Sequence, residues 1–184
     1  MKVIETSLPG VLIIEPKVFD DARGFFMETY HEERYREAGV NCRFVQDNFS
    51  YSVYGTLRGL HYQYPHGQAK FVQVLMGEVF DVAVDIRRGS PTFGQWYGEY
   101  LSDKNRRQLL IPEGYAHGFC VLSKTALFIY KCTDFYEPGS ERGILWSDPG
   151  LGIEWPVDNP LLSEKDSNYQ FLGNVPADNL PVYS

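Results

Sequence analysis

Hydrophobic and polar residues alternate with a period of two along much of the chain between residues 45 and 136. The clearest stretch is VFDVAVDIR, residues 79–87, in which four apolar side chains alternate with two aspartates and an alanine. A second stretch, ALFIYKCTDF, places Tyr130 on the same face as Phe128 and Cys132. Because successive side chains of a strand point to opposite faces, this period predicts β-strands in sheets with unlike faces.

Turn residues divide these stretches into many short strands. Met76-Gly77-Glu78 resembles a hairpin turn, and HEERYREAG, residues 31–39, predicts one short helix closed by a glycine. Many strands and few helices indicate a β-sandwich or barrel. From Asp148 onward the chain is rich in Pro, Gly and Asp, so we expect a loop-rich segment, residues 148–184, that packs on the barrel, with a loose tail at DNLPVYS.

Length and charge narrow the classes of function. A chain of 184 residues fits one domain, residues 1–184, and no repeat or linker divides it. The net charge of -7 disfavours proteins that coat nucleic acid or anionic membranes. Three cysteines without a CxxC pair, and the absence of a signal peptide or a long apolar run, favour a cytoplasmic protein.

The histidines differ in their surroundings. His31 and His66 lie beside glutamates and in a Pro-Gly turn, so we expect them in solvent, whereas His61 and His117 lie among strand residues. An isolated histidine of the second kind is ordinarily a satisfied core residue. Here, however, Lys70 shares the parity of the apolar residues in its predicted strand, and a lysine on an inward face is costly unless an anion meets it.

These side chains suit the removal of a proton from a carbon next to a carbonyl group. Neutral His61 would take the proton, the Lys70 ammonium would stabilise the enolate, and the phenol of Tyr130 would return a proton. If acid and base act on opposite faces, the carbon is inverted. An epimerase that needs neither cofactor nor metal is therefore conceivable.

A second group of residues suggests an anion site. Arg23, Arg58 and the amides of Gln46 and Asn48 would together hold a diphosphate next to aromatic rings. Each signal is weak alone, and Arg23 would equally pair with the neighbouring Asp20 or Asp21.

Taken together, the motifs resemble one known family, the dTDP-4-dehydrorhamnose 3,5-epimerases. The matching segments run in the family's order along nearly the whole chain: FDDARGFFMETY, FVQDNFSYSVYGTLRGLHYQ, GQAKFVQVLMGEVFDVAVDIRRGSPTFGQW, IPEGYAHGFCVLS, YKCTDFYEPGSERGILWSDPGLGIEWP and LLSEKD. The resemblance implies an all-β fold, a cupin-type β-jelly-roll barrel with a few short helices. It also implies a homodimer whose N-terminal strands are exchanged, so that Arg23 and Glu28 complete the partner's site.

The resemblance assigns roles to individual residues. His61 would be the general base, oriented by Asp166 of LLSEKD, and Tyr130 would be the proton donor. Lys70 would hold the enolate, and His117 would contact the sugar. The positions implied to hold the nucleotide sugar are Arg23, Phe26, Glu28, Gln46, Asp47, Asn48, Arg58, Glu141 and Lys165, with Tyr136 as the ring that stacks on thymine.

The implied reaction inverts C3 and C5 of dTDP-4-dehydro-6-deoxy-D-glucose, giving dTDP-4-dehydro-L-rhamnose for dTDP-L-rhamnose biosynthesis. Three alternatives remain open. One is a metal-dependent cupin, suggested by PEGYAH, although Gln63 and Lys70 stand where a histidine and a carboxylate ligand would be expected. The others are a non-catalytic sugar-nucleotide binding module and an epimerase that inverts one carbon, C3 or C5 only, of a related dTDP-4-keto sugar.

Overall fold

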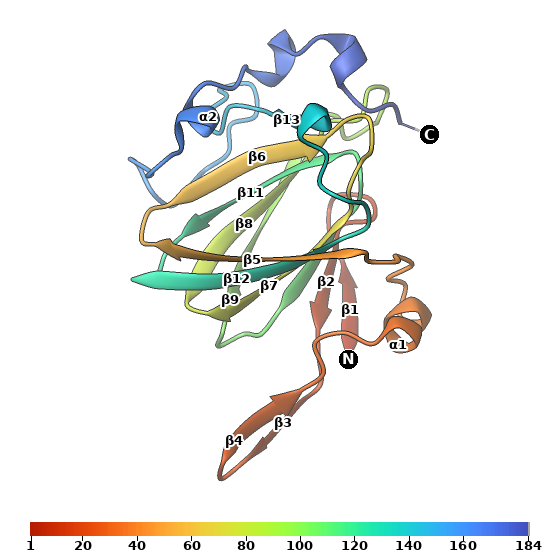
Figure 1. The fold of residues 1–184 in the computed structure, drawn as a ribbon, viewed down its shortest axis with the longest axis vertical. Coiled ribbons are helices and arrows are strands. Elements are labelled where there is room, and N and C mark those ends of the chain that lie inside the picture. The colour runs from red at the N-terminus through yellow and green to blue at the C-terminus, as the bar shows by residue number, and fades with distance from the viewer. Residues whose placement is uncertain (184) are drawn as a thin grey trace.

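The computed structural model describes residues 1–183, which form two antiparallel β-sheets packed face to face (Figure 1). The six-stranded sheet has the order β1-β2-β10-β7-β12-β5 and the five-stranded sheet the order β13-β6-β11-β8-β9. The strands of the first are β1 (Lys2–Glu5), β2 (Leu12–Glu15), β5 (Gln46–Val53), β7 (Lys70–Met76), β10 (Gln108–Ile111) and β12 (Thr125–Cys132). Those of the second are β6 (Leu57–Gln63), β8 (Glu78–Asp85), β9 (Trp96–Ser102), β11 (Tyr115–Val121) and β13 (Glu141–Gly143). The predicted all-β barrel is confirmed.

The helices are short and lie outside the sheets. They are α1 (Glu32–Glu37), α2 (Glu164–Ser167) and the 3-10 turns η1 (Pro138–Ser140), η2 (Leu172–Asn174) and η3 (Ala177–Asn179). The predicted helix is confirmed as α1, with the His31 side chain accepting a hydrogen bond from the Arg34 amide as its N-cap. Within the described residues, no helix is both long and apolar enough to cross a membrane.

The main hydrophobic core fills the space between the two sheets. Val72 and Val74 of β7 and Phe128 of β12 point into it, as their alternation predicts. The rings of Phe119 and Phe128 come from opposite sheets and stack with their centroids 4.2 Å apart. The two sheets are thus joined through their apolar faces, as in a β-sandwich.

Strand β8 is buried on both faces, which its alternating sequence does not reveal. Phe80, Val82 and Val84 face away from the barrel interior, against a second core under the C-terminal segment, whereas Val79 and Ala83 belong to the main core. Asp81 and Asp85 are also fully buried. They are satisfied by hydrogen bonds from His117 to Asp81 and from Arg87, Ser90 and Thr92 to Asp85.

The turn at Gly77 is not a hairpin, so that prediction is wrong. β7 belongs to the six-stranded sheet and β8 to the five-stranded sheet. The chain therefore passes from one sheet to the other at this point. The period of two identifies strands but does not tell which strands pair.

The end of the chain is not a loose tail, at least through Tyr183. The Arg88 amide donates to Pro181 O and the Tyr183 amide donates to Arg88 O. The Arg87 guanidinium lies 4.9 Å from the centre of the Tyr183 ring. These contacts hold the segment against the barrel; the last residue of the predicted tail, Ser184, lies outside the described residues.

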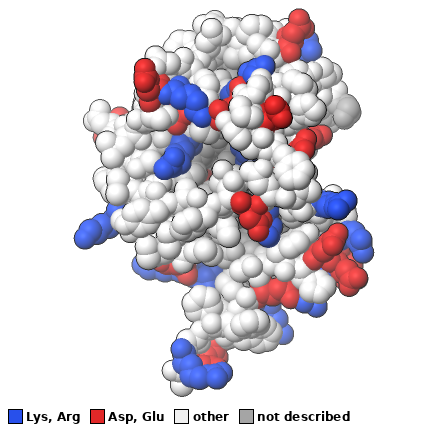
Figure 2. Space-filling view, in the orientation of Figure 1, with Lys and Arg blue, Asp and Glu red and all other residues white. Residues whose placement is uncertain are grey.

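A two-stranded hairpin, β3 (Val18–Asp21) and β4 (Gly24–Met27), projects from the body of the molecule (Figure 1). Its aromatic residues Phe19, Phe25 and Phe26 are more than half exposed. Figure 2 shows acidic and basic side chains together at the tip of this hairpin.

Candidate functional site

A pocket of about 190 Å³ opens at one end of the barrel, between β5 and β6. Figure 2 shows this face hollowed, with both basic and acidic side chains near the hollow. The lining residues come from both sheets, from the loop between β6 and β7 and from the segment before η1: Gln46, Asn48, His61, Tyr62, Gln63, Gln68, Lys70, Tyr130, Tyr136 and Glu141. Strands distant in sequence therefore converge on one polar pocket.

His61 reaches the pocket because β6 approaches β11 unusually closely. A Cβ atom at Gly59 would lie 2.5 Å from the Gly118 Cα atom of β11, so only glycine fits at this position. The β6–β11 register shifts between His117 and Phe119, next to this contact. Gly59 and Gly118 therefore set the position of β6 against β11, and with it the position of His61 in the pocket.

Asp166 holds the imidazole of His61 from outside the barrel. The distance from His61 Nε2 to Asp166 Oδ1 is 2.6 Å. Asp166 lies on α2, whose N-cap is Ser163; the Ser163 hydroxyl accepts a hydrogen bond from the Asp166 amide. The predicted partners are therefore in direct contact, although they lie 105 residues apart in sequence.

The electrostatics of this pair define the tautomer of His61. Burial is the largest single effect on the pKa of Asp166 and raises it, but the hydrogen bond and charge of His61, together with hydrogen bonds from Ser163 and Gly59, outweigh burial and lower the pKa of this carboxyl. An ionised carboxylate only accepts hydrogen bonds, so His61 Nε2 carries the proton and Nδ1 retains a free lone pair. Burial is also the largest effect on the pKa of His61 and lowers it; together with the charges of Lys70 and Lys165 it exceeds the opposite effect of Asp166. The imidazole is therefore neutral and able to accept a proton near neutral pH.

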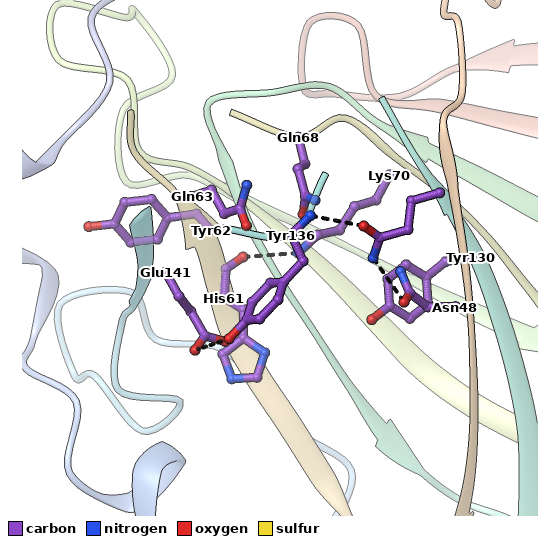
Figure 3. Close-up of a pocket in the computed structure, with 10 residues that line it drawn as sticks. Asn48, His61, Tyr62, Gln63, Gln68, Lys70, Tyr130, Tyr136 and Glu141 are labelled. Carbon is purple, nitrogen blue, oxygen red and sulfur yellow. Dashed lines mark hydrogen bonds between the residues drawn. The ribbon is translucent and has the colours of Figure 1, made fainter. Parts of the chain in front are cut away.

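Lys70 and Tyr130 face His61 from the other sheet (Figure 3). The Lys70 Nζ atom donates a hydrogen bond to His61 O at 3.4 Å, and no carboxylate of residues 1–183 lies within ion-pair distance of it. Burial lowers the pKa of Lys70, because an ammonium without a counter-charge is poorly solvated. An anion in the pocket would offset that cost. Burial also raises the pKa of Tyr130, so its phenol stays protonated and can donate.

A network of polar side chains lies at the outer end of the pocket (Figure 3). The Tyr136 hydroxyl donates to Glu141 Oε2 at 3.1 Å, and Lys165 Nζ donates to Glu141 Oε1 at 2.7 Å. Gln46 donates to Asn48 Oδ1 at 3.0 Å. Tyr136 is half exposed, so its ring offers a face to a planar ligand.

Two predicted residues of the barrel, His117 and Asp47, lie away from the pocket. His117 is buried, with Nε2 2.9 Å from Asp81 Oδ1 and its ring stacked on Phe128. Asp47 points outward and pairs with Lys131 at 2.9 Å. The roles predicted for His117 and Asp47 stay predictions.

Arg58 occupies an intermediate place. Its Nε atom donates to the Ser52 hydroxyl at 3.1 Å. Its positive charge also acts on the phenol of Tyr130, where it opposes the rise in pKa that burial causes. Arg58 is not among the residues that line the pocket, and the role predicted for it stays a prediction.

Three further predicted residues, Arg23, Phe26 and Glu28, lie on or next to the projecting hairpin. Arg23 pairs with Asp21 at 2.7 Å, which is the local alternative that the sequence leaves open, and Glu28 pairs with Arg34. Phe26 is 69% exposed. Within one chain, none of the three joins the residues that line the pocket.

Sequence reasoning missed several residues of the site. Gln63 and Gln68 line the pocket, and Asp81 anchors His117. The Tyr169 ring lies edge-on to His61, with centroids 5.9 Å apart, and a Cβ atom at Gly143 would come within 2.3 Å of the same ring. Tyr169 follows Asp166 in a segment without periodicity, so no pattern marks it. Among residues 1–183, no group of three His, Cys, Asp or Glu side chains gathers as metal ligands.

Comparison with known proteins gives a consistent result. The sequence profile of the dTDP-4-dehydrorhamnose 3,5-epimerases matches residues 5–174. The dTDP-4-dehydrorhamnose 3,5-epimerase of Shigella flexneri is 62% identical over 172 residues, 92% of this chain and 95% of that protein. The dTDP-4-dehydrorhamnose 3-epimerase of Streptomyces niveus is 42% identical over 187 residues, covering 100% and 90%.

A solved structure agrees with the fold. The dTDP-6-deoxy-D-glucose-3,5-epimerase of Legionella pneumophila, in complex with dTDP-4-keto-L-rhamnose, superposes with a TM-score of 0.97 at 55% identity and covers 100% of this chain and 98% of that one. Sequence profile, close relatives and fold therefore place this chain in the dTDP-4-dehydrorhamnose 3,5-epimerase family.

Proposed function

We propose that the protein is a dTDP-4-dehydrorhamnose 3,5-epimerase, an isomerase that converts dTDP-4-dehydro-6-deoxy-D-glucose to dTDP-4-dehydro-L-rhamnose. One observation carries the proposal. The His61–Asp166 pair lies on one side of a single pocket, and Tyr130 lies with Lys70 on the other side. This is the arrangement that inversion requires, because the proton leaves on one face of the carbon and returns on the other.

The first step removes a proton next to the C4 ketone. His61 Nδ1 takes the proton from C3 or C5, the C–H electrons form the enolate, and the negative charge develops on the C4 oxygen. Asp166 stabilises the imidazolium that forms, and the ammonium of Lys70 stabilises the oxygen. The ketone itself makes these protons acidic, so the residues of the chain suffice for the chemistry.

The second step protonates the enolate from the opposite side. The phenol of Tyr130 donates its proton to the carbon, the carbon is inverted, and the ketone is restored. Both reacting carbons flank the same ketone, so one set of groups serves both. The phenolate of Tyr130 must then be reprotonated before the next inversion.

The nucleotide end of the substrate occupies the outer part of the pocket in this proposal. Tyr136 stacks on the thymine ring, and Arg58 contacts the diphosphate. The amides of Gln46 and Asn48 and the Glu141–Lys165 pair give the remaining polar contacts. His117 contacts the sugar end of the substrate in this proposal, and its hydrogen bond to Asp81 fixes the orientation of its ring.

The assembly that we propose is a homodimer. The edge strand β5 exposes Phe49, Tyr51 and Val53, which are 63%, 55% and 48% accessible, on a face that is usually covered in a soluble protein. The projecting hairpin carries the exposed Phe26, and near its tip Arg106, from the turn before β10, contacts the Phe25 ring and Asp20. A second copy would cover this face, and the hairpin would bring Arg23, Phe26 and Glu28 to the partner's pocket.

A second candidate is an epimerase that inverts one carbon only. It is favoured by the 42% identity to the 3-epimerase of Streptomyces niveus. The Shigella flexneri double epimerase is closer, at 62%. Base and acid are the same in both reactions, so the geometry of the pocket decides how often the second carbon reacts.

Proton NMR of dTDP-4-dehydro-6-deoxy-D-glucose with the protein in deuterated water tests the proposal. Deuterium at both C3 and C5, with product reduced to dTDP-L-rhamnose by an added reductase, is the expected result. Exchange at one carbon would favour the second candidate. Tight binding of dTDP without exchange would make the protein a binding module and overturn the role of His61.

A further inference from the structure

The segment that carries Tyr136 is held by glutamine side chains. Residues 134–137 connect β12 to η1, and within the described part of the chain no other backbone group bonds the backbone of residues 134–136. Their main-chain bonds to glutamine side chains are Gln68 Nε2 to Asp134 O, 2.8 Å; Gln63 Nε2 to Phe135 O, 3.3 Å; Tyr136 N to Gln46 Oε1, 2.8 Å; and Glu137 N to Gln63 Oε1, 2.8 Å.

Gln63 makes the largest contribution to this arrangement. It is 7% exposed and uses both its amide oxygen and its amide nitrogen on neighbouring main-chain groups. Besides the two bonds to residues 134–137, its nitrogen donates to His66 O at 2.8 Å. Such a fully used, buried amide is costly to replace, because each partner would be left without a hydrogen bond.

Gln63 also lies two residues after His61 on β6, and both side chains line the pocket (Figure 3). One strand thus carries the candidate base and the side chain that bonds the Tyr136 segment. A rigid strand fixes the spacing between them.

We infer that Gln63 is a positioning residue that sets the place of the Tyr136 ring relative to His61, and so aligns the nucleotide end of the substrate with the base. The inference deepens the proposed function and rests on it. The Tyr136 ring is half exposed, and its hydroxyl bonds only Glu141 among the described residues. Its position therefore depends on the backbone that Gln63 holds.

The isosteric change Gln63→Glu tests the role of the amide donor. An ionised carboxylate accepts from the Glu137 amide but faces the carbonyl oxygens of His66 and Phe135 without a proton to donate. The segment should move, and the ring with it. We expect the Kd for dTDP, measured by titration calorimetry, and the KM for the substrate to rise about tenfold. A change of this size corresponds to the loss of about one hydrogen bond between protein and ligand. We expect kcat to stay within about twofold, because saturating substrate restores the alignment.

Gln73→Glu is the matched control. Gln73 is equally buried at 7%, and it acts as acceptor of a hydrogen bond from Gln108, a role that a carboxylate retains. It does not line the pocket. Its Kd for dTDP should remain that of the wild type. If Gln63→Glu lowers the melting temperature strongly, Gln68→Glu, which removes the donor to Asp134 O, takes its place in the same measurement.

A double-mutant cycle separates positioning from a general loss of structure. If Gln63 acts through Tyr136, Tyr136→Ala alone and Tyr136→Ala combined with Gln63→Glu should bind dTDP equally weakly. Additive losses would overturn the inference, as would an unchanged Kd and KM in Gln63→Glu beside a wild type that binds dTDP. A wild type that neither binds dTDP nor turns the substrate over would instead overturn the proposed function.

Discussion

The barrel pocket and the projecting hairpin carry candidate residues in opposite physical conditions. In the pocket, His61, Lys70 and Tyr130 have pKa values shifted by burial, and Asp166 lies in the dyad. On the hairpin, Arg23 is 90% exposed and pairs with the neighbouring Asp21. Chemistry needs shifted pKa values and fixed geometry, which one folded chain can supply. Residues without such surroundings acquire a function only through a ligand or a second chain.

The largest expected effect lies in the pocket. His61→Asn should lower kcat by about a thousandfold, because a neutral amide cannot take a proton, and general base catalysis contributes 10²–10⁴-fold. Binding of dTDP should be unchanged. Exchange of the C3 and C5 protons with deuterated water measures the loss. His66→Asn is the control, since His66 is exposed and its φ of 63° suits asparagine. Equal exchange rates in His61→Asn and the wild type would remove His61 as the base.

The second effect separates the two sides of the pocket. Tyr130→Phe keeps the ring but removes the acid, so we expect inversion to fall by about a hundredfold while deuterium still enters at carbon from the His61 side. Proton NMR of substrate and product measures exchange and inversion together. A Tyr130→Phe variant with full inversion would show that another group is the acid.

The third effect tests the hairpin. Arg23→Ala should raise KM about tenfold and leave kcat nearly constant if the guanidinium contacts substrate, since a hydrogen bond to a charged group contributes about 1.5–3 kcal/mol. Arg36→Ala, at an exposed position of α1, should change neither value.

Mixing variants shows whose pocket the hairpin serves. After subunit exchange, inactive His61→Asn and weakened Arg23→Ala chains should form mixed dimers with one intact site, and activity should rise above the mean of the two. Activity equal to that mean would place Arg23 at its own chain's pocket or outside any pocket.

The smallest effect concerns the pH profile. Burial lowers the pKa of His61, so the base stays neutral and active at lower pH than an ordinary histidine. Asp166 opposes this shift, while Lys70 and Lys165 reinforce it; Glu141 is the other carboxyl facing the ring. Tyr169→Leu should expose His61 to water and weaken the burial effect. The pKa should then rise, and the acidic limb of kcat/KM should move to higher pH.

Gly143→Ala should move the acidic limb in the same direction, because a Cβ atom at this position would come within 2.3 Å of the Tyr169 ring and displace it. Tyr100→Leu, a half-exposed tyrosine on β9, is the control. An acidic limb that stays in place in both test variants would mean that Tyr169 does not shield His61.

The sequence predicts the strands and the inward direction of Lys70 and Tyr130 from a local period, and the helix α1 from helix-forming residues closed by a glycine. It does not predict that β7 and β8 lie in different sheets, since pairing depends on partners far along the chain. It also misjudges the last residues, whose main-chain bonds to Arg88 leave no trace in composition. Within the site, the contact of His61 with Asp166 came only from family resemblance, because no spacing joins two residues so far apart. Gln68 and Tyr169 escaped because they lie in segments without a period, whereas Gln63 shares a face of β6 with His61, and its partners in residues 134–137 are distant in sequence.

The separation of 105 residues between His61 and Asp166 has a consequence for how the protein becomes active. Contacts between distant residues form late in folding, because a long loop must first close. The barrel strands can assemble while α2 is still undocked, and such a chain would be compact without the contact between His61 and Asp166 that we propose to be catalytic. During refolding, enzymatic activity should therefore return after the circular dichroism signal of the sheets. The delay between the two signals would give the time that the C-terminal segment needs to dock on the barrel.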